Sequence, residues 1–201
     1  QYSVRGGNFD ENLVYVNGIE VYRPFLIHSG QQEGLSFVNS DLVGSILFSA
    51  GGFSAKYGDK MSSVLDIKYK QPKKISSSVS MSLLGGSAHL EGISKNRRLS
   101  YLLGLRHKSN QYLLNSLDTE AEYRPRFSDL QTFINYKLNT NWDISFLSNI
   151  SSNQYQMIPQ DRNTDFGTFN EALRLTIFFE GQELDKYQTY FGALSTKYNP
   201  N

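Results

Sequence analysis

The sequence contains no cysteine in its 201 residues, and neither sign of charge dominates. The lack of cysteine excludes a disulfide framework, a zinc site with cysteine ligands and thiol catalysis. The 20 lysines and arginines nearly balance the 19 aspartates and glutamates, and no basic block stands out. A nucleic-acid partner therefore has no support in the composition, because such partners select for clustered positive charge.

Long apolar runs are also missing from the sequence. No segment approaches the roughly 18 consecutive apolar residues that a membrane-spanning helix needs. A transmembrane β-barrel stays compatible with this composition, because alternate residues of its strands face a polar lumen. The 13 tyrosines, 13 phenylalanines and single tryptophan supply the aromatic content that barrel girdles use, although a soluble β-protein can carry as many.

Catalytic signatures are absent as well. The sequence has no His-Glu-x-x-His, no Gly-x-Ser-x-Gly, no phosphate loop and no Gly-x-Gly-x-x-Gly motif. Its 3 histidines are scattered and lack a metal-binding spacing. We therefore predict that the protein is not an enzyme and has no cofactor.

The first 70 residues contain β-rich runs joined by turn residues. Strands are predicted at 43–49 and 64–69, because both runs are rich in β-formers and are bounded by residues that tolerate positive φ. Further upstream, two β-rich runs flank Asn17-Gly18, a dipeptide that is a strong hairpin signal. These features indicate a compact sheet. The run Gln71-Pro72-Lys73-Lys74 then interrupts the pattern and is the best candidate for a domain boundary.

After residue 74 the pattern changes to alternating apolar and polar residues. It predicts six antiparallel strands of roughly 9–11 residues, the length that a tilted membrane strand needs. Gly85-Gly86 is expected to turn the chain between the first two. The connections at 94–97 and 139–140 are short and those at 111–126 and 154–185 are long, as in outer-membrane barrels. Within the last long connection, residues 173–179 alternate too, and we expect a hairpin above the membrane.

Five pieces of the sequence, in order, resemble the plug domain of TonB-dependent outer-membrane receptors, most closely those of Bacteroidota. They are Val4-Arg5-Gly6, Leu13 to Ile19, Ser45 to Phe48, Ala55-Lys56-Tyr57-Gly58 and Ser62 to Ile67. Asn17 stands where the family usually has Asp, and Ser62-Ser63 where it often has a glycine pair. The resemblance implies a mainly β fold: a partial, globular α+β plug domain at 1–70, a linker at 71–74, and the N-terminal strands of an outer-membrane β-barrel at 75–201.

The resemblance also implies a function, which is TonB-dependent active transport of a large or scarce nutrient across the bacterial outer membrane. The plug would occlude the barrel lumen, and TonB would bind a segment outside this chain. Expected partners are the nutrient, outer-membrane lipid and a surface lipoprotein. Because six strands cannot close a barrel around a plug, we expect this chain to be part of a longer protein. Two alternatives stay open: a soluble β-sandwich or adhesin-type binding module, and a plugged barrel that serves as a structural component of an outer-membrane complex.

By position, the loops at 7–11 and 22–28 match the plug apices, where receptors of this family meet their substrate from outside. Aromatic residues with a few polar groups on ordered loops suit capture of a small ligand. The alternative is that the aromatic side chains pack the loops and that Arg23 pairs with a barrel carboxylate. The candidate substrate-binding residues are Asn8, Phe9, Asp10, Tyr22, Arg23, Phe25 and His28.

Two further positions carry expectations. Arg5 resembles the family arginine that ties the plug to acidic residues of the barrel, so a plug–barrel contact is expected there. The oxygen-bearing residues Asp161, Asn163 and Asp165 are spaced as in a calcium loop. Phe166 stands where such a loop has glycine, however, so a solvated loop is favoured and no metal site is predicted.

Overall fold

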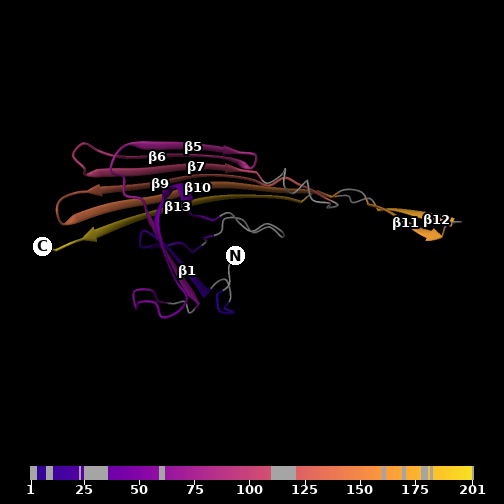
Figure 1. Cartoon of the computed structure of the whole chain (residues 1–201), viewed down its shortest axis with the longest axis horizontal. Coiled ribbons are helices and arrows are strands. Elements are labelled where there is room, and N and C mark those ends of the chain that lie inside the picture. Colours follow the sequence, from indigo (N-terminus) through magenta and orange to yellow (C-terminus); the bar gives the residue numbers. More distant parts are fainter. Residues whose placement is uncertain are drawn as a thin grey trace.

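The computed structural model describes residues 4–7, 11–22, 24, 36–58, 62–109, 121–159, 162–168, 171–177, 181 and 183–200. They form a four-stranded sheet, a seven-stranded sheet and a two-stranded hairpin. We call the first two the N-terminal sheet and the large sheet. Figure 1 shows the long strands of the large sheet running side by side, with the N-terminal sheet against one of its faces. No helix among the described residues has the length and apolar character needed to cross a membrane.

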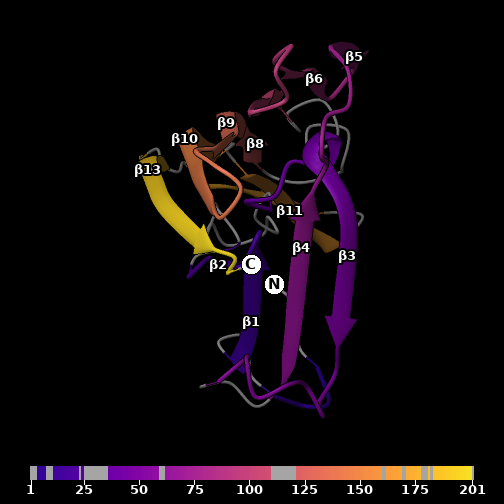
Figure 2. The same cartoon turned by 90° about the vertical axis from the view of Figure 1, so that its left-hand side faces the viewer.

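The N-terminal sheet has the strand order β2-β1-β4-β3. Strands β1 and β4 are parallel, with Leu13 opposite Val64, and the other two pairs are antiparallel. Figure 2 shows β1, β4 and β3 standing side by side. The bounds are β1 (Asn12–Val16), β2 (Ile19–Glu20), β3 (Val43–Ser49) and β4 (Ser63–Tyr69). Both strands predicted from the β-rich runs are thus confirmed. A short 3₁₀ helix, η2 (Ser40–Leu42), precedes β3.

Asn17 and Gly18 form the predicted hairpin turn between β1 and β2. Both have positive φ, 52° and 82°, as a tight two-residue turn requires. The Asn17 amide donates to the Ile67 carbonyl over 2.8 Å, and its side-chain oxygen accepts from the Tyr69 amide over 2.9 Å. The turn therefore satisfies a backbone donor at the end of β4. The side-chain nitrogen of Asn17 is buried without a hydrogen-bond partner in the described part of the chain.

Asn17→Ala should speed amide hydrogen exchange at Tyr69 in the full-length protein by about tenfold or more. The change removes the acceptor of a part-buried N–H, a loss of roughly 1–3 kcal/mol, and leaves alanine at positive φ. Asn17→Asp is the matched control, because it keeps the acceptor oxygen and removes the unpartnered nitrogen. Exchange at Tyr69 should change less than about threefold there. Equal exchange rates in the two variants would contradict this role of the Asn17 oxygen.

The large sheet is antiparallel, with the order β13-β10-β9-β7-β6-β5. The short strand β8 pairs with the last residues of β10, beyond the part of β10 that pairs with β9. All six predicted strands are present in sequence order. Strand β10 has 18 residues, β13 has 16 and β5 has 7, so the predicted length of roughly 9–11 residues is wrong for these three. The bounds are β5 (Ser76–Ser82), β6 (Gly85–Ile93), β7 (Leu99–Lys108), β8 (Ala121–Tyr123), β9 (Arg126–Lys137), β10 (Trp142–Pro159) and β13 (Glu183–Tyr198). The lengths of β10 and β13 were underestimated because their backbone pairing continues after the apolar alternation ends.

The first turn of the large sheet is not where the glycines predicted it. Leu83 and Leu84 form the turn, and Gly85 already pairs with Ser82 as the first residue of β6. Gly85 has φ 133°, and a Cβ at this position would overlap the His107 carbonyl of β7. The glycine is therefore needed for close approach of a neighbouring strand rather than for the turn.

The long connection after β10 contains the expected hairpin. Strand β11 (Arg162–Thr168) pairs with β12 (Glu171–Ile177), and neither joins the large sheet. Figure 1 shows this hairpin well beyond one end of the large sheet. We call the end of the large sheet nearest to this hairpin the loop end. The opposite end, which carries the short connections at 94–98 and 138–141, is the turn end.

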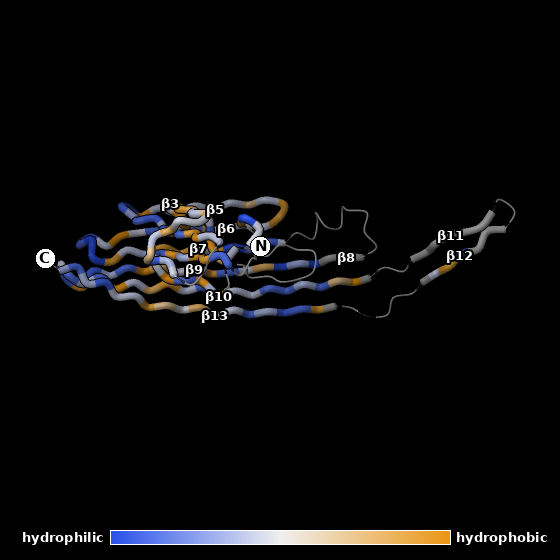
Figure 3. Tube along the Cα trace, turned by 90° about the horizontal axis from the view of Figure 1, so that it is seen from below, coloured by the Kyte–Doolittle hydropathy of each residue, from blue (hydrophilic) through white to orange (hydrophobic). Residues whose placement is uncertain are grey.

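The large sheet has one apolar and one polar face. Ladder partners show that Trp142, Tyr136 and Tyr198 share the face directed away from the N-terminal sheet, which we call the outer face. Figure 3 shows the resulting alternation of apolar and polar residues along the strands. Many of its apolar side chains are exposed, with Met81 at 89% and Tyr190 at 73%. Other exposed members are Val79, Leu105, Leu130, Phe146, Ile150 and Leu194.

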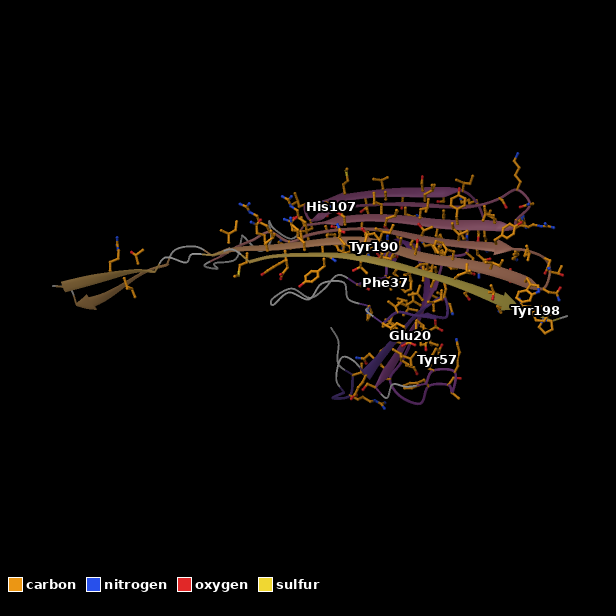
Figure 4. The ribbon with its side chains drawn as sticks, turned by 180° about the vertical axis from the view of Figure 1, so that it is seen from behind. Glu20, Phe37, Tyr57, His107, Tyr190 and Tyr198 are labelled. Carbon is orange, nitrogen blue, oxygen red and sulfur yellow. The ribbon has the colours of Figure 1, made fainter. Side chains whose placement is uncertain are left out.

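The inner face of the large sheet shares one hydrophobic core with the N-terminal unit, by which we mean the N-terminal sheet and the described segments up to residue 70 that join its strands. Leu102, Phe127 and Leu147 contribute from the large sheet. Phe37 packs edge-on against Phe191 of β13, with ring centroids 5.2 Å apart, and Figure 4 shows it between the two units. The remaining buried members are Val14, Val16, Val21, Leu42, Ile67 and Tyr69. The two sheets are therefore packed as one body at this junction.

Candidate functional site

Arg106 is a buried cation on the inner face of β7. Its Nε and Nη2 donate to the two carboxylate oxygens of Asp129 on β9, over 2.8 and 2.6 Å. The guanidinium also lies 5.4 Å from the centroid of the Phe127 ring. Asn149 of β10 donates to Asp129 over 3.1 Å. Such a bidentate pair fixes the plane of the guanidinium and leaves its other N–H groups free to bind elsewhere.

Those remaining N–H groups bind the backbone of the N-terminal unit. The Nη1 of Arg106 donates to the Val38 carbonyl over 2.9 Å, and Nη2 donates to the Ser36 carbonyl over 3.1 Å. A longer contact, 3.4 Å, joins Nη2 to the Phe37 carbonyl. One side chain of the large sheet thus holds three consecutive carbonyls of a neighbouring unit.

Gln131 of β9, which is 0% exposed, makes the second set of bonds at this junction. Its Nε2 donates to the Phe37 carbonyl. Its Oε1 accepts from the Asn39 amide over 3.2 Å and from the Tyr69 hydroxyl over 2.9 Å. All three of these partners lie in the N-terminal unit, so these bonds of Gln131 exist only while the two units are in contact.

Tyr69 is the hydroxyl donor that completes the set. Burial raises the pKa of the Tyr69 hydroxyl well above its usual value, and the charge of Asp129 adds to the effect while Arg106 opposes it. The hydroxyl therefore stays protonated, and can donate to Gln131, throughout the physiological range. Its ring also packs edge-on against Phe133 of β9, with centroids 6.0 Å apart.

A glycine lets the backbones approach next to these bonds. A Cβ on Gly104 of β7 would lie 2.5 Å from the Asn39 side-chain nitrogen and 3.3 Å from Leu42. Asn39 is fully buried and its side-chain oxygen caps η2 by accepting from the Asp41 amide over 3.0 Å. The chain can lie this close to the large sheet only because position 104 has no side chain.

We call the stretch 36–39, together with Arg106, Asp129 and Gln131, the latch. Its bonds go mainly to main-chain carbonyls, so they hold the position of the stretch rather than select its side chains. The latch carries no nucleophile or general base aimed at a vacant position. The described residues also contain no group of three or more His, Cys, Asp or Glu side chains that could hold a metal ion. The arrangement can hold a segment of chain in place.

Comparison with known proteins identifies the N-terminal unit. A family model, the TonB-dependent receptor plug domain, matches residues 1–64. This unit is a TonB-dependent receptor plug domain. The fold class predicted from sequence, a mainly β chain with a plug followed by a partial barrel-like sheet, is confirmed. The plug family is one of transporters rather than enzymes. Among its described residues, the plug contains strands and one 3₁₀ helix but no α-helix, so its expected α part is not seen there.

Among solved structures, the chain is similar to the crystal structure of the siderophore receptor PirA from Pseudomonas aeruginosa. The TM-score is 0.48 at 15% sequence identity, and the match covers 94% of this chain and 35% of that receptor. The chain thus spans about a third of the length of that receptor. No curated protein matches the sequence.

Of the predicted substrate-binding residues, the structure describes Tyr22. It is 83% exposed, at the end of the plug hairpin. Asn8, Phe9, Asp10, Arg23, Phe25 and His28 lie outside the described residues. Substrate contact by this set stays a prediction.

The structure also describes Arg5 and two residues of the calcium-like spacing, Asn163 and Asp165. Arg5 is exposed, has φ 51°, and its guanidinium lies beside Gly51 of the plug. Its expected contact with the barrel stays a prediction. Asn163 and Asp165 lie on the extended strand β11, opposite Thr176 and Arg174 of β12, and Asp161 lies outside the described residues.

Among the described residues, the arginine that joins the plug to the large sheet is Arg106, for which the sequence reasoning predicted no role. It belongs to the large sheet, and the plug supplies carbonyls rather than carboxylates. One signal was available in the sequence. Arg106 and Asp129 are opposite charges at paired positions of β7 and β9, and such a pair indicates a buried contact once the strands are known to be neighbours.

Proposed function

We propose that this chain is the plug and the first part of the barrel of a TonB-dependent transporter in the bacterial outer membrane. The observation that carries the proposal is the latch, which fastens the plug to the inner face of a sheet whose outer face is apolar. The partners proposed are TonB, acting through a segment outside this chain, outer-membrane lipid and a nutrient whose class the plug does not specify.

The outer face supports membrane insertion. Its apolar residues on β10 extend from Trp142 to Ile150, which is about 27 Å along the strand and about 21 Å after a tilt of about 40°. This is close to the apolar band of outer-membrane barrels, about 25 Å tall. Trp142 and Tyr198 contact each other at the turn end, with ring centroids 5.0 Å apart, as expected of an aromatic girdle. Beyond Ile150, outward residues of β10 such as Ser152 and Gln154 are polar.

The latch supports a plug that is fastened at one stretch of chain and could be released there. A pull on the plug would act on a stretch of four residues, so its bonds to Arg106 and Gln131 would break one after another. Each such bond contributes about 0.5–3 kcal/mol net, with the charged ones at the upper end. The plug is therefore held firmly at rest, and a protein that transmits energy from the inner membrane can release it in small steps.

Single cysteines in the full-length protein test the proposed topology, because this chain has none of its own. We would place one at Thr164, on the hairpin past the loop end, and one at Asn139, in a connection at the turn end. Whole cells would then be treated with a membrane-impermeant maleimide. Labelling at 164 but not at 139 is expected, since the barrel would separate the two positions.

Labelling at both positions would overturn the proposal in favour of a surface module or secreted protein. Permeabilised cells provide the control, because both cysteines should react there. A protein that spans the membrane but takes up nothing would be the structural component considered above. Comparing compounds lost from the medium by cells with and without the gene distinguishes that case.

A further inference from the structure

A cavity of about 510 Å³ lies at the turn end, between the plug and the inner face of the large sheet. The plug contributes Asn17 and the end of β4, and the large sheet contributes inward residues of several strands. Six side chains of the lining are cationic and a single one, Asp143, is a carboxylate. The cationic residues are Lys68, Lys70, Arg97, Arg98, Lys137 and Lys197.

Strand register places two of these lysines on either side of the carboxylate. Asp143 of β10 is opposite Lys137 of β9 and opposite Lys197 of β13. With neighbouring strands about 4.8 Å apart, the two lysines are held on the same face about 10 Å from each other. Asp143 also accepts from the side-chain nitrogen of Asn199 over 3.5 Å. One carboxylate therefore lies between two exposed cations on the same face of the sheet.

The other cations add to this excess. Lys68 pairs with the buried Asp66 over 3.3 Å. Within the described part of the chain, Lys70, Arg97 and Arg98 have no carboxylate within ion-pair distance. Like charges about 10 Å apart repel at low ionic strength, where the Debye length of about 30 Å exceeds their separation. A bound anion would relieve that repulsion.

We propose that this cavity binds a small multivalent oxyanion, carrying phosphate or several carboxylates. Its volume is that of a small-molecule site, which favours a compact anion over a folded partner. Arginine forks are suited to bidentate recognition of such groups, and lysines supply point charges around them. A second hollow, of about 470 Å³, shares Arg97, Arg98, Lys137 and Asp143 and continues toward the connections of the turn end.

The site goes beyond the proposed function. Its existence does not depend on transport, since it follows from the contact of plug and large sheet alone. If the transporter proposal holds, the turn end faces the periplasm, and the cavity lies where cargo leaves the lumen. Rings of cationic side chains have this role in pores for anions and phosphate.

Calorimetric titration of the purified full-length protein in detergent with inorganic pyrophosphate, at low salt, tests the site. Lys137→Gln with Lys197→Gln should raise the dissociation constant by about tenfold or more, because two charge-assisted contacts are lost. The matched control is Arg126→Gln with Lys186→Gln, which neutralises exposed cations at the loop end of the same two strands. The control should change the constant by less than about twofold. A parallel titration with citrate distinguishes carboxylate from phosphate preference.

Absence of pyrophosphate and citrate binding by the unaltered protein at millimolar concentration would overturn the proposal. An equal loss in the two double variants would also overturn it, since binding would then reflect net charge. Binding of an acidic peptide without binding of either small anion would assign the surface to a protein partner instead. Amide exchange at Asn39, unchanged in both variants, shows that the plug stays seated. Maleimide labelling decides the transporter proposal separately.

Discussion

Replacing Arg106 by Met should speed amide hydrogen exchange at Asn39 in the full-length protein by about two to three orders of magnitude. The Asn39 amide reports directly on the junction, because it donates to Gln131 of β9. Removing one partner of a buried ion pair costs about 3–5 kcal/mol, since Asp129 keeps its charge without its guanidinium. The Ser36 and Val38 carbonyls of the plug lose their Arg106 donor at the same time, whereas the Phe37 carbonyl keeps its bond from Gln131. A tenfold change in exchange corresponds to about 1.4 kcal/mol.

Two further variants separate the ion pair from general damage. Arg126→Met changes an exposed arginine of β9, and should leave exchange at Asn39 within about threefold of the original rate. Adding Asp129→Leu to Arg106→Met removes the stranded charge, so it should recover part of the loss. If exchange at Asn39 in Arg106→Met stays as slow as in the unaltered protein, the apolar core alone holds the stretch 36–39. The latch would then have no role in fastening the plug.

A disulfide between plug and barrel should abolish uptake completely. The Asn39 Cγ, close to where the sulfur of a cysteine at 39 would lie, is 3.3 Å from where a Cβ of Gly104 would be, so Asn39→Cys with Gly104→Cys places the two side chains within reach of a disulfide. If transport requires the plug to leave the large sheet at this point, the oxidised variant will deplete no more of the medium than cells lacking the gene. Dithiothreitol should restore depletion, which mass spectrometry of the medium measures.

A second disulfide controls for the presence of a bridge itself. Ser148→Cys with Gly192→Cys would join β10 to β13 at paired positions on the outer face, within the large sheet. Uptake by that variant should stay the same whether oxidised or reduced. Each single cysteine of the plug–barrel pair, tested under the same oxidising conditions, accounts for the loss of the Asn39 cap. Full uptake by the oxidised plug–barrel double variant would show that the plug passes cargo while attached at this point.

Much of the fold could be predicted from the pattern of neighbouring residues in the sequence. The strands at β3, β4 and β7, the Asn17-Gly18 turn and the outlying β11–β12 hairpin each follow from a few adjacent residues. The errors arose where longer-range geometry decided the outcome. Gly85 reads as a turn residue, yet the approach of β7 accounts for it. Similarly, the residues from Gln154 onward were predicted to begin a long connection, yet β10 and β13 pair through Gln154 to Met157.

The candidate site could be predicted from the sequence to a smaller extent than the fold. None of Arg106, Asp129 and Gln131 was predicted to be a functional residue. Arg106 and its plug carbonyl at Ser36 are 70 positions apart, and no local pattern links them. The resemblance drew attention to Arg5 instead, because the family pattern places the arginine on the plug.

By itself, the sequence determined which residues of each strand face outward and which inward, because side chains alternate along an extended backbone whatever the strand packs against. It also indicated, through the family resemblance, a plug followed by alternating strands, and the plug match at residues 1–64 and the strands of the large sheet confirm that order. Only the tertiary structure decided which inward residues meet the plug. That choice depends on strand register, on the missing side chain at Gly104, and on a core that closes over both units. A buried arginine or glutamine is stable only where such packing brings partners to it.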